Sequence, residues 1–203
     1  GAFRRILGRW QRTAPAETPI ELVNRTLGSI HGVDLNPYAV AIARFRLLLE
    51  ALRASGIERL ERAPAFGIQL ACGDSLLHGA AGGDQTILPW DPLAHAYFAE
   101  DLGELRRMLR PGQYHAVVAN PPYITPKDKA LNEAYRERYA SCHRKYSLAV
   151  PFLERIFNLA VGGGFTGQIT ANSFMKREFG KKLIEAVLPT LDLTHVIDTS
   201  GAY

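Results

Sequence analysis

The sequence has little of what secreted and membrane proteins depend on. It contains 2 cysteines, Cys72 and Cys142, which are too few for a disulfide framework and fit a reducing compartment. It has no apolar run long enough to cross a bilayer, and its first residues carry no signal-peptide pattern. We therefore expect a cytoplasmic protein with no membrane partner.

An initiating methionine, internal repeats and low-complexity tracts are also missing. The lack of a first methionine indicates a fragment of a longer protein. What is present fits a globular domain, because 47% of the residues are hydrophobic and 22% are charged. The formal net charge of +4 permits a nucleic-acid partner without requiring one.

Expected strands and helices alternate along the chain, which is typical of an α/β fold with a mostly parallel sheet covered on both faces. The strands are expected at residues 30–34, 67–71, 114–119, 166–171 and 193–197. Asn36 and Pro37 can cap and open the helix that follows the first strand. The apolar stripe of this helix consists of Ala41, Phe45, Leu48, Leu49 and Leu52.

The connecting segments differ in character. A glycine-rich loop at 79–91 precedes a helix that ends near Arg110. A later helix ends at the glycines of 162–164, and another runs to about Leu188, where a proline stops it. Residues 125–146 fit no regular element and are expected to form an irregular insertion.

The most specific motif is Asn120-Pro121-Pro122-Tyr123, directly behind an apolar strand. Two consecutive prolines fix two φ angles and remove two backbone donors, so the loop is rigid. The Asn120 side-chain oxygen and the Pro121 carbonyl can both accept from one exocyclic amino group, which aligns its nitrogen with an electrophilic methyl group. Tyr123 offers a flat face on which a flipped-out base can stack. The alternative is a turn that only ends the strand.

Acidic residues end the first two strands. Asp34 stands before a capped helix, where a carboxylate can accept both hydroxyls of a ribose, or can serve the helix macrodipole. Asp74, followed by Ser75, could accept from an adenine amino group, or could belong to an ordinary turn. Ligands bind outside the carboxyl ends of parallel strands, so we expect Asp34, Asp74 and Asn120 to lie along one rim.

The order of these motifs, each one strand further along the chain, resembles that of the amino-methyltransferases of DNA. Residues 142–149 and 168–174 narrow the resemblance to the large adenine-specific methyltransferases of bacterial restriction and phage-defence systems, most closely the PglX type of BREX systems. The resemblance runs over most of the chain. It implies a Rossmann-like S-adenosylmethionine-dependent methyltransferase fold, with residues 1–203 forming part of the catalytic domain and incomplete at both ends.

The resemblance also implies roles for single residues. Asp34 would bind the ribose of S-adenosylmethionine, and Leu35 would belong to the same cofactor site. Asp74 and Ser75 would bind the cofactor's adenine, and the residues from Asn120 to Tyr123 would hold the target base. The family's glycine-rich cofactor loop is expected before the first residue of this chain, so we expect little methyl transfer by these 203 residues alone.

Basic and aromatic residues are interleaved in residues 125–146. They are Lys127, Lys129, Arg136, Arg138, Arg144 and Lys145, with Tyr135, Tyr139 and Tyr146. Beside a catalytic rim such a segment could contact phosphates and stack on bases, or it could be a solvated loop of mixed charge. Cys142-His143 does not indicate zinc, because a structural site needs about four ligands and the other cysteine lies on a different expected element. We expect no metal.

We therefore expect methyl transfer from S-adenosylmethionine to the exocyclic amine of adenine in DNA, within a restriction-modification or phage-defence system that includes other subunits. The sulfonium already activates the methyl group, so alignment and a polar cradle are the main tasks of the protein. One alternative is a methyltransferase of protein glutamine or of RNA, because the motif suits any planar amide or amidine nitrogen. Another is an inactive fragment that only binds nucleic acid.

Overall fold

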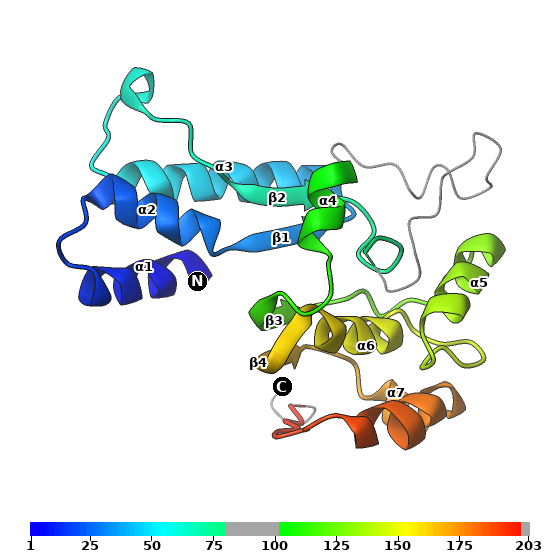
Figure 1. Ribbon diagram of the computed structural model, residues 1–203. Helices are drawn as coiled ribbons and strands as arrows, with labels where there is room; N and C mark the ends of the chain where they lie inside the picture. The colour runs from blue at the N-terminus through cyan, green and yellow to red at the C-terminus, as the bar shows by residue number, and fades with distance from the viewer. Residues whose placement is uncertain (80–101, 200–203) are drawn as a thin grey trace. The chain divides into compact units, whose positions relative to one another are not determined.

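The computed structural model describes residues 1–79 and 102–199 (Figure 1). The described residues form two units with their own internal contacts, one made of residues 1–75 and 102–108, the other of residues 76–79 and 109–199. Most of the expected glycine-rich loop, from residue 80 to residue 91, lies outside the described residues.

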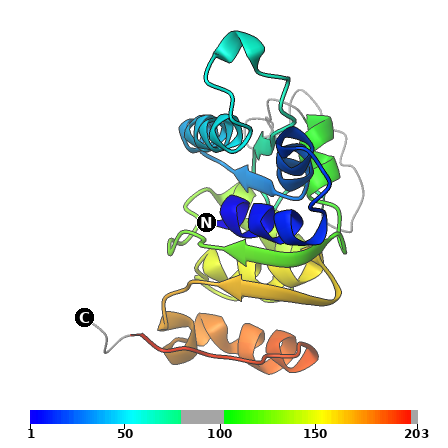
Figure 2. The ribbon, with the colours of Figure 1, turned by 90° about the vertical axis from the view of Figure 1, so that its left-hand side faces the viewer.

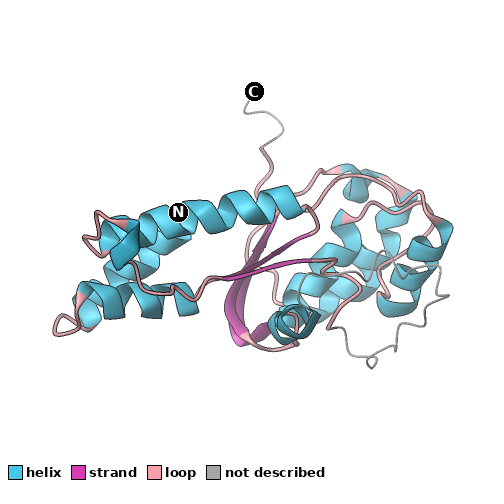
Figure 3. Cartoon of the chain, turned by 90° about the horizontal axis from the view of Figure 1, so that it is seen from above, coloured by secondary structure: helices cyan, strands magenta, loops and turns pink. Residues whose placement is uncertain are grey.

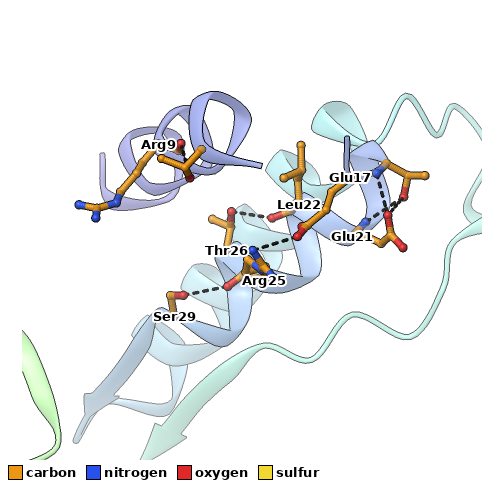
Figure 4. A network of polar contacts seen from close by, with 9 residues as sticks. Arg9, Glu17, Glu21, Leu22, Arg25, Thr26 and Ser29 are labelled. Atoms are coloured by element: carbon orange, nitrogen blue, oxygen red, sulfur yellow. Dashed lines mark hydrogen bonds and ion pairs between the residues drawn. The ribbon is translucent and has the colours of Figure 1, made fainter. Parts of the chain in front are cut away.

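The first unit begins with α1 (Ala2–Thr13) and α2 (Pro19–Gly28), which pack with α3 (Pro37–Ala54). A capping box starts α2: the Thr18 hydroxyl accepts from Glu21 N at 3.3 Å, and the Glu21 carboxylate accepts from Thr18 N at 2.7 Å (Figure 4). The buried residues that join the three helices are Phe3, Val23, Leu27 and Ala51. Amphipathic helices thus provide the core of this unit.

Strand β1 (His31–Asp34) pairs in parallel with β2 (Gln69–Cys72) in the same unit. Helices α3 and α4 (Leu102–Met108) contact both strands, and they lie on opposite sides of the pair in Figure 2. A 3₁₀ turn, η1 (Leu60–Arg62), lies between α3 and β2. The expected parallel pairing and the cover on two sides are confirmed for these two strands.

The start of α3 is as expected, because the Asn36 side-chain oxygen accepts from Tyr38 N at 2.9 Å. The expected apolar stripe is wrong in part: Phe45 is 60% exposed and Leu49 is 49% exposed. The buried face runs through Val40 and Ala51 instead. The helix is apolar on more than one side, so periodicity did not decide which side faces the core.

In the second unit, β3 (Tyr114–Ala119) pairs in parallel with β4 (Ala160–Gln168). The strands are magenta in Figure 3. Helix α6 (Ala149–Leu159) packs against both of them. Val118 and Phe165, in contrast, are 85% and 75% exposed.

The beginning of β4 corrects the sequence analysis. We expected the glycines of 162–164 to end a helix and the strand to span 166–171, but α6 ends at Leu159 and the glycines belong to β4. Gly163 has φ +75°, and the pairing register shifts between Tyr114 and Ala116. A glycine with positive φ at such an irregularity is typical of a β-bulge, which a sequence pattern does not distinguish from a helix stop.

Residues 125–146 also differ from the expectation of an irregular segment. They contain α5 (Lys129–Arg138), whose first turn is capped by Asp128, with its carboxylate accepting from Leu131 N at 2.8 Å. The C-terminal part of the chain is less regular than expected, since short helical turns replace one long helix. These are α7 (Ser173–Lys176), η2 (Glu178–Gly180), η3 (Leu183–Val187) and η4 (Leu188–Thr190).

The expected strand at residues 193–197 is also wrong. Among the described residues it pairs with no other strand, and Leu193, Val196 and Ile197 are exposed. An apolar run becomes a strand only where a neighbour takes its backbone hydrogen bonds. No helix in the described part of the chain is long and apolar enough to span a membrane.

Candidate functional site

The Asn-Pro-Pro-Tyr loop follows β3 directly, as expected. Asn120, Pro122 and Tyr123 are exposed, with the Tyr123 side chain 48% exposed, whereas Pro121 is buried. The Tyr123 hydroxyl donates to the Asn120 side-chain oxygen at 3.3 Å. The loop therefore presents an amide oxygen and an aromatic ring at the surface of its unit, and its first proline is buried.

Backbone hydrogen bonds hold this loop at both ends. Before it, the Ala119 carbonyl accepts from Ile169 N at 3.1 Å, which extends the pairing of β3 with β4. After it, the Ile124 carbonyl accepts from Leu148 N at 2.9 Å, just before α6 begins. The positions of Asn120 and its neighbours are thus fixed by two parts of the chain that lie far away in the sequence.

The expected cofactor residues lie in the first unit, at the ends of β1 and β2. Asp34 pairs in register with Cys72, and the Asp34 carbonyl accepts from Gly73 N at 3.0 Å. Asp34 ends β1, and Asp74 and Ser75 follow the neighbouring strand β2. The two acids therefore follow the same ends of two neighbouring parallel strands.

The exposure and bonding of these residues suit a polar ligand with apolar parts. The Asp34 carboxylate accepts from Asn36 N at 2.7 Å, so it does order the start of the helix, which was one of the two expectations. A carboxylate has about four lone-pair sites, so this exposed group can accept further hydrogen bonds from a diol. Leu35 is 66% exposed and offers apolar surface, while Asp74 is 7% exposed. The residues present thus fit a nucleoside.

A common rim for the acids and for Asn120 stays a prediction. Asp34 and Asp74 belong to the first unit, and the Asn-Pro-Pro-Tyr loop belongs to the second.

The tyrosines of residues 125–146 do not form a stacking surface. Tyr135, Tyr139 and Tyr146 are 2%, 4% and 0% exposed and belong to one hydrophobic cluster. The Tyr139 hydroxyl donates to the Leu76 carbonyl at 2.8 Å, and the Tyr146 hydroxyl donates to the Asn132 carbonyl at 3.0 Å. The hypothesis that they stack on bases is wrong, because these buried aromatic rings belong to the hydrophobic core of the second unit.

Several basic groups of the same segment are also engaged within the chain. The Arg136 guanidinium lies over the Tyr146 ring, 5.2 Å from its centroid, and Arg144 pairs with Glu178 at 2.6 Å. Cys142 is 5% exposed, and burial raises the pKa of its thiol to about 12. It is thus a structural thiol of low reactivity. Among the described residues no cluster of His, Cys, Asp and Glu could hold a metal ion.

Comparison with known proteins identifies the family of the chain. Residues 28–203 match the model of the Eco57I restriction-modification methylase family. The chain belongs to this family. The matched range contains every candidate cofactor residue and the whole Asn-Pro-Pro-Tyr loop. The resemblance to adenine-specific methyltransferases of restriction and phage-defence systems is confirmed.

The curated relatives are much longer than this chain. The chain aligns over its full length, at 51% identity, with the adenine-specific methyltransferase PglX of Streptomyces coelicolor, of which it covers 18%. It is 34% identical to the type II methyltransferase M.PaeR7I of Pseudomonas aeruginosa over 43% of its own length and 16% of that protein. For M.BstVI of Geobacillus stearothermophilus the identity is 30%, over 42% of the chain and 16% of that protein. No solved structure matches the chain.

Proposed function

We propose that this chain belongs to a Rossmann-like catalytic domain that transfers a methyl group from S-adenosylmethionine to the exocyclic amine of adenine in DNA. The observation that carries this proposal is the Asn-Pro-Pro-Tyr loop, anchored at both ends and exposing the Asn120 amide and the Tyr123 ring behind a parallel strand. The family to which the chain belongs supports the same chemistry.

The loop supplies two acceptors for the amino group. An amide oxygen has two lone pairs, so Asn120 can accept from the target amine while it keeps the bond from the Tyr123 hydroxyl. The Pro121 carbonyl is the second acceptor. Hydrogen bonds from both N–H groups of the amine to these acceptors orient the nitrogen lone pair toward the methyl group, and a rigid loop needs little reorganisation to do this.

The first unit would hold the cofactor. When bound, S-adenosylmethionine supplies a methyl group already activated by its sulfonium, so the chain needs no metal for this step. Asp34 would accept from the ribose hydroxyls, Leu35 would pack beside the ribose, and Asp74 with Ser75 would accept from the adenine amine. Each of these contacts orients the cofactor without taking part in bond breaking.

DNA is the partner that suits the loop. An adenine stacked within a DNA duplex cannot reach the loop that follows β3, so the base must leave the stack. The half-exposed Tyr123 ring offers the flipped base a new stacking partner. We propose that the full-length protein acts in a restriction-modification or phage-defence system of the BREX kind, together with other subunits.

The test is transfer of a labelled methyl group by the full-length protein, with duplex DNA, RNA and protein offered as acceptors. We expect label on adenine of DNA from wild type, none from Asn120→Ala, and full activity from Asn24→Ala, which removes an exposed asparagine on α2. Tyr123→Phe keeps the ring and should retain most of the activity, whereas Tyr123→Ala should lose about 1–3 kcal/mol of stacking. Label on RNA or on protein glutamine, with none on DNA, would refute the proposal.

A further inference from the structure

We infer that Gln168 is a positioning residue for the catalytic loop, because its side chain closes a ring of hydrogen bonds around Asn120–Tyr123. The inference rests on the proposed function and assigns a role to a residue outside the Asn-Pro-Pro-Tyr motif. Gln168 is the last residue of β4 and lies in register opposite Ala119, the residue just before Asn120.

The ring can be followed bond by bond. The next residue after Gln168, Ile169, donates its backbone N–H to the Ala119 carbonyl at 3.1 Å. The Gln168 Nε2 donates to the Ala149 carbonyl at 2.8 Å. The residue just before Ala149 is Leu148, whose N–H donates to the Ile124 carbonyl at 2.9 Å. The two backbone anchors of the loop are therefore joined to each other by one side chain, that of Gln168.

The orientation of the Gln168 amide is decided by its partner. A carbonyl can only accept, so the group that faces Ala149 must be the NH2. The Gln168 Oε1 atom is buried and accepts no hydrogen bond from any described residue. A buried acceptor without a donor destabilises the fold, and a methionine of similar shape would avoid this loss. Stability alone therefore does not favour glutamine at position 168. Its amide donor to the Ala149 carbonyl, at the start of α6, is the feature that glutamine provides and methionine does not.

Attachment of α6 to the sheet does not depend on this amide. Val150, Ile156 and Leu159 of α6 are 1%, 3% and 7% exposed, so apolar packing holds the helix. The amide instead fixes where the first turn of α6, and with it the anchor at Leu148, stands relative to the end of β4. It also joins the two segments, 142–149 and 168–174, that narrowed the family resemblance and that the proposed chemistry leaves without a role.

The decisive variant is Gln168→Met in the full-length protein, which keeps the shape of the side chain and removes its donor. Gln113→Met is a matched control, since the Gln113 Nε2 also donates to a backbone carbonyl, that of Arg110, at 2.9 Å, away from the loop. Ile156→Val is a second control, because it trims a buried residue of α6 and lowers stability without touching the ring.

Hydrogen exchange measures the ring without any assumption about the reaction. In Gln168→Met we expect amides in peptides covering 119–126 and 146–150 to exchange about fivefold faster, the change for one lost hydrogen bond of average strength. Gln113→Met should leave the rates in these two peptides unchanged, and Ile156→Val, which acts only through the stability of the unit, should raise them by less than Gln168→Met does. Unchanged loop exchange in Gln168→Met, or an equal rise in Ile156→Val, overturns the inference.

Kinetics tests the positioning role. We expect Gln168→Met to lower kcat about tenfold or more with KM for DNA unchanged, because a small displacement of an aligned loop reduces transfer more than binding. A wild-type kcat in Gln168→Met, or a parallel change of kcat and KM, also overturns the inference. Absence of methyl transfer from wild type would refute the proposed function alone, and the exchange rates would then decide on Gln168.

Discussion

Arg155 should be the most sensitive charged residue of the second unit. It lies on α6, is 1% exposed, and its guanidinium donates to the His78 carbonyl at 2.8 Å, the Leu109 carbonyl at 2.7 Å and the Asn158 side-chain oxygen at 2.6 Å. Burial lowers the pKa of Arg155, as expected for a charge removed from water. We consider Arg155→Met, which keeps an apolar stem and removes all of these donors.

The expected loss follows from those contacts. Buried acceptors that lose their donor cost about 1–3 kcal/mol each, and removal of the desolvated charge offsets part of the sum. We therefore expect the free energy of opening of this unit to fall by about 2–4 kcal/mol in Arg155→Met. Arg144→Met, which breaks an exposed pair with Glu178, should change it by at most about 1 kcal/mol.

The assay is hydrogen exchange of the β3 and α6 amides in the full-length protein, since it reports the stability of one unit separately. A loss in Arg155→Met no larger than that in Arg144→Met would refute the reasoning. Such a result would mean that the carbonyls find other donors in the variant, or that the desolvation penalty of the buried guanidinium is as large as the stabilisation from its hydrogen bonds.

Three further predictions concern single positions. Gly79 has φ +67°, and a Cβ there would come within 2.6 Å of the backbone carbonyl carbon of Leu109. Gly112 has a similar φ of +66°, but no atom lies within 4 Å of its Cβ position. Gly79→Ala should therefore destabilise the second unit by more than Gly112→Ala, as measured by hydrogen exchange. Burial lowers the pKa of His31 below 6.5, so the unfolded protein binds the proton more readily than the folded protein, and the free energy of unfolding should fall as the pH drops below about 6.5. His31→Gln should lose less stability than wild type over that window in pH-dependent unfolding, and an equal loss would contradict this. Asp34→Ala and Asp74→Ala should each weaken S-adenosylmethionine binding by about 1–3 kcal/mol in calorimetry, and unchanged affinity in both would exclude the assigned cofactor site.

Local signals in the sequence predicted the parts of the fold that local chemistry decides. The cap at Asn36 and the proline after it set the start of α3, and the acids at the ends of β1 and β2 follow from where those strands stop. The Asn-Pro-Pro-Tyr loop after β3 was predicted because an asparagine and two prolines directly behind an apolar strand are unusual together. In each case neighbouring residues carry the information.

Long-range packing decided what the sequence did not predict. The burial of Tyr139 could not be predicted from its neighbours in the sequence, because its hydroxyl partner, the Leu76 carbonyl, lies 63 positions away. The helix α5 was missed although Asp128 is a typical N-cap, because the mixed charges after it hid the apolar face. The role of Gln168 likewise depends on a contact with Ala149 that no spacing rule gives.

The measurement that tests the central claim most directly is methylated-base analysis of genomic DNA. Cells that lack the full-length gene would receive wild type, Asn120→Ala or Tyr123→Phe, and their DNA would be hydrolysed and analysed by mass spectrometry. We predict adenine methylated at its exocyclic nitrogen with wild type and with Tyr123→Phe, and none with Asn120→Ala at equal protein level. Equal methyladenine with Asn120→Ala, or none in any of the three strains, would contradict the account.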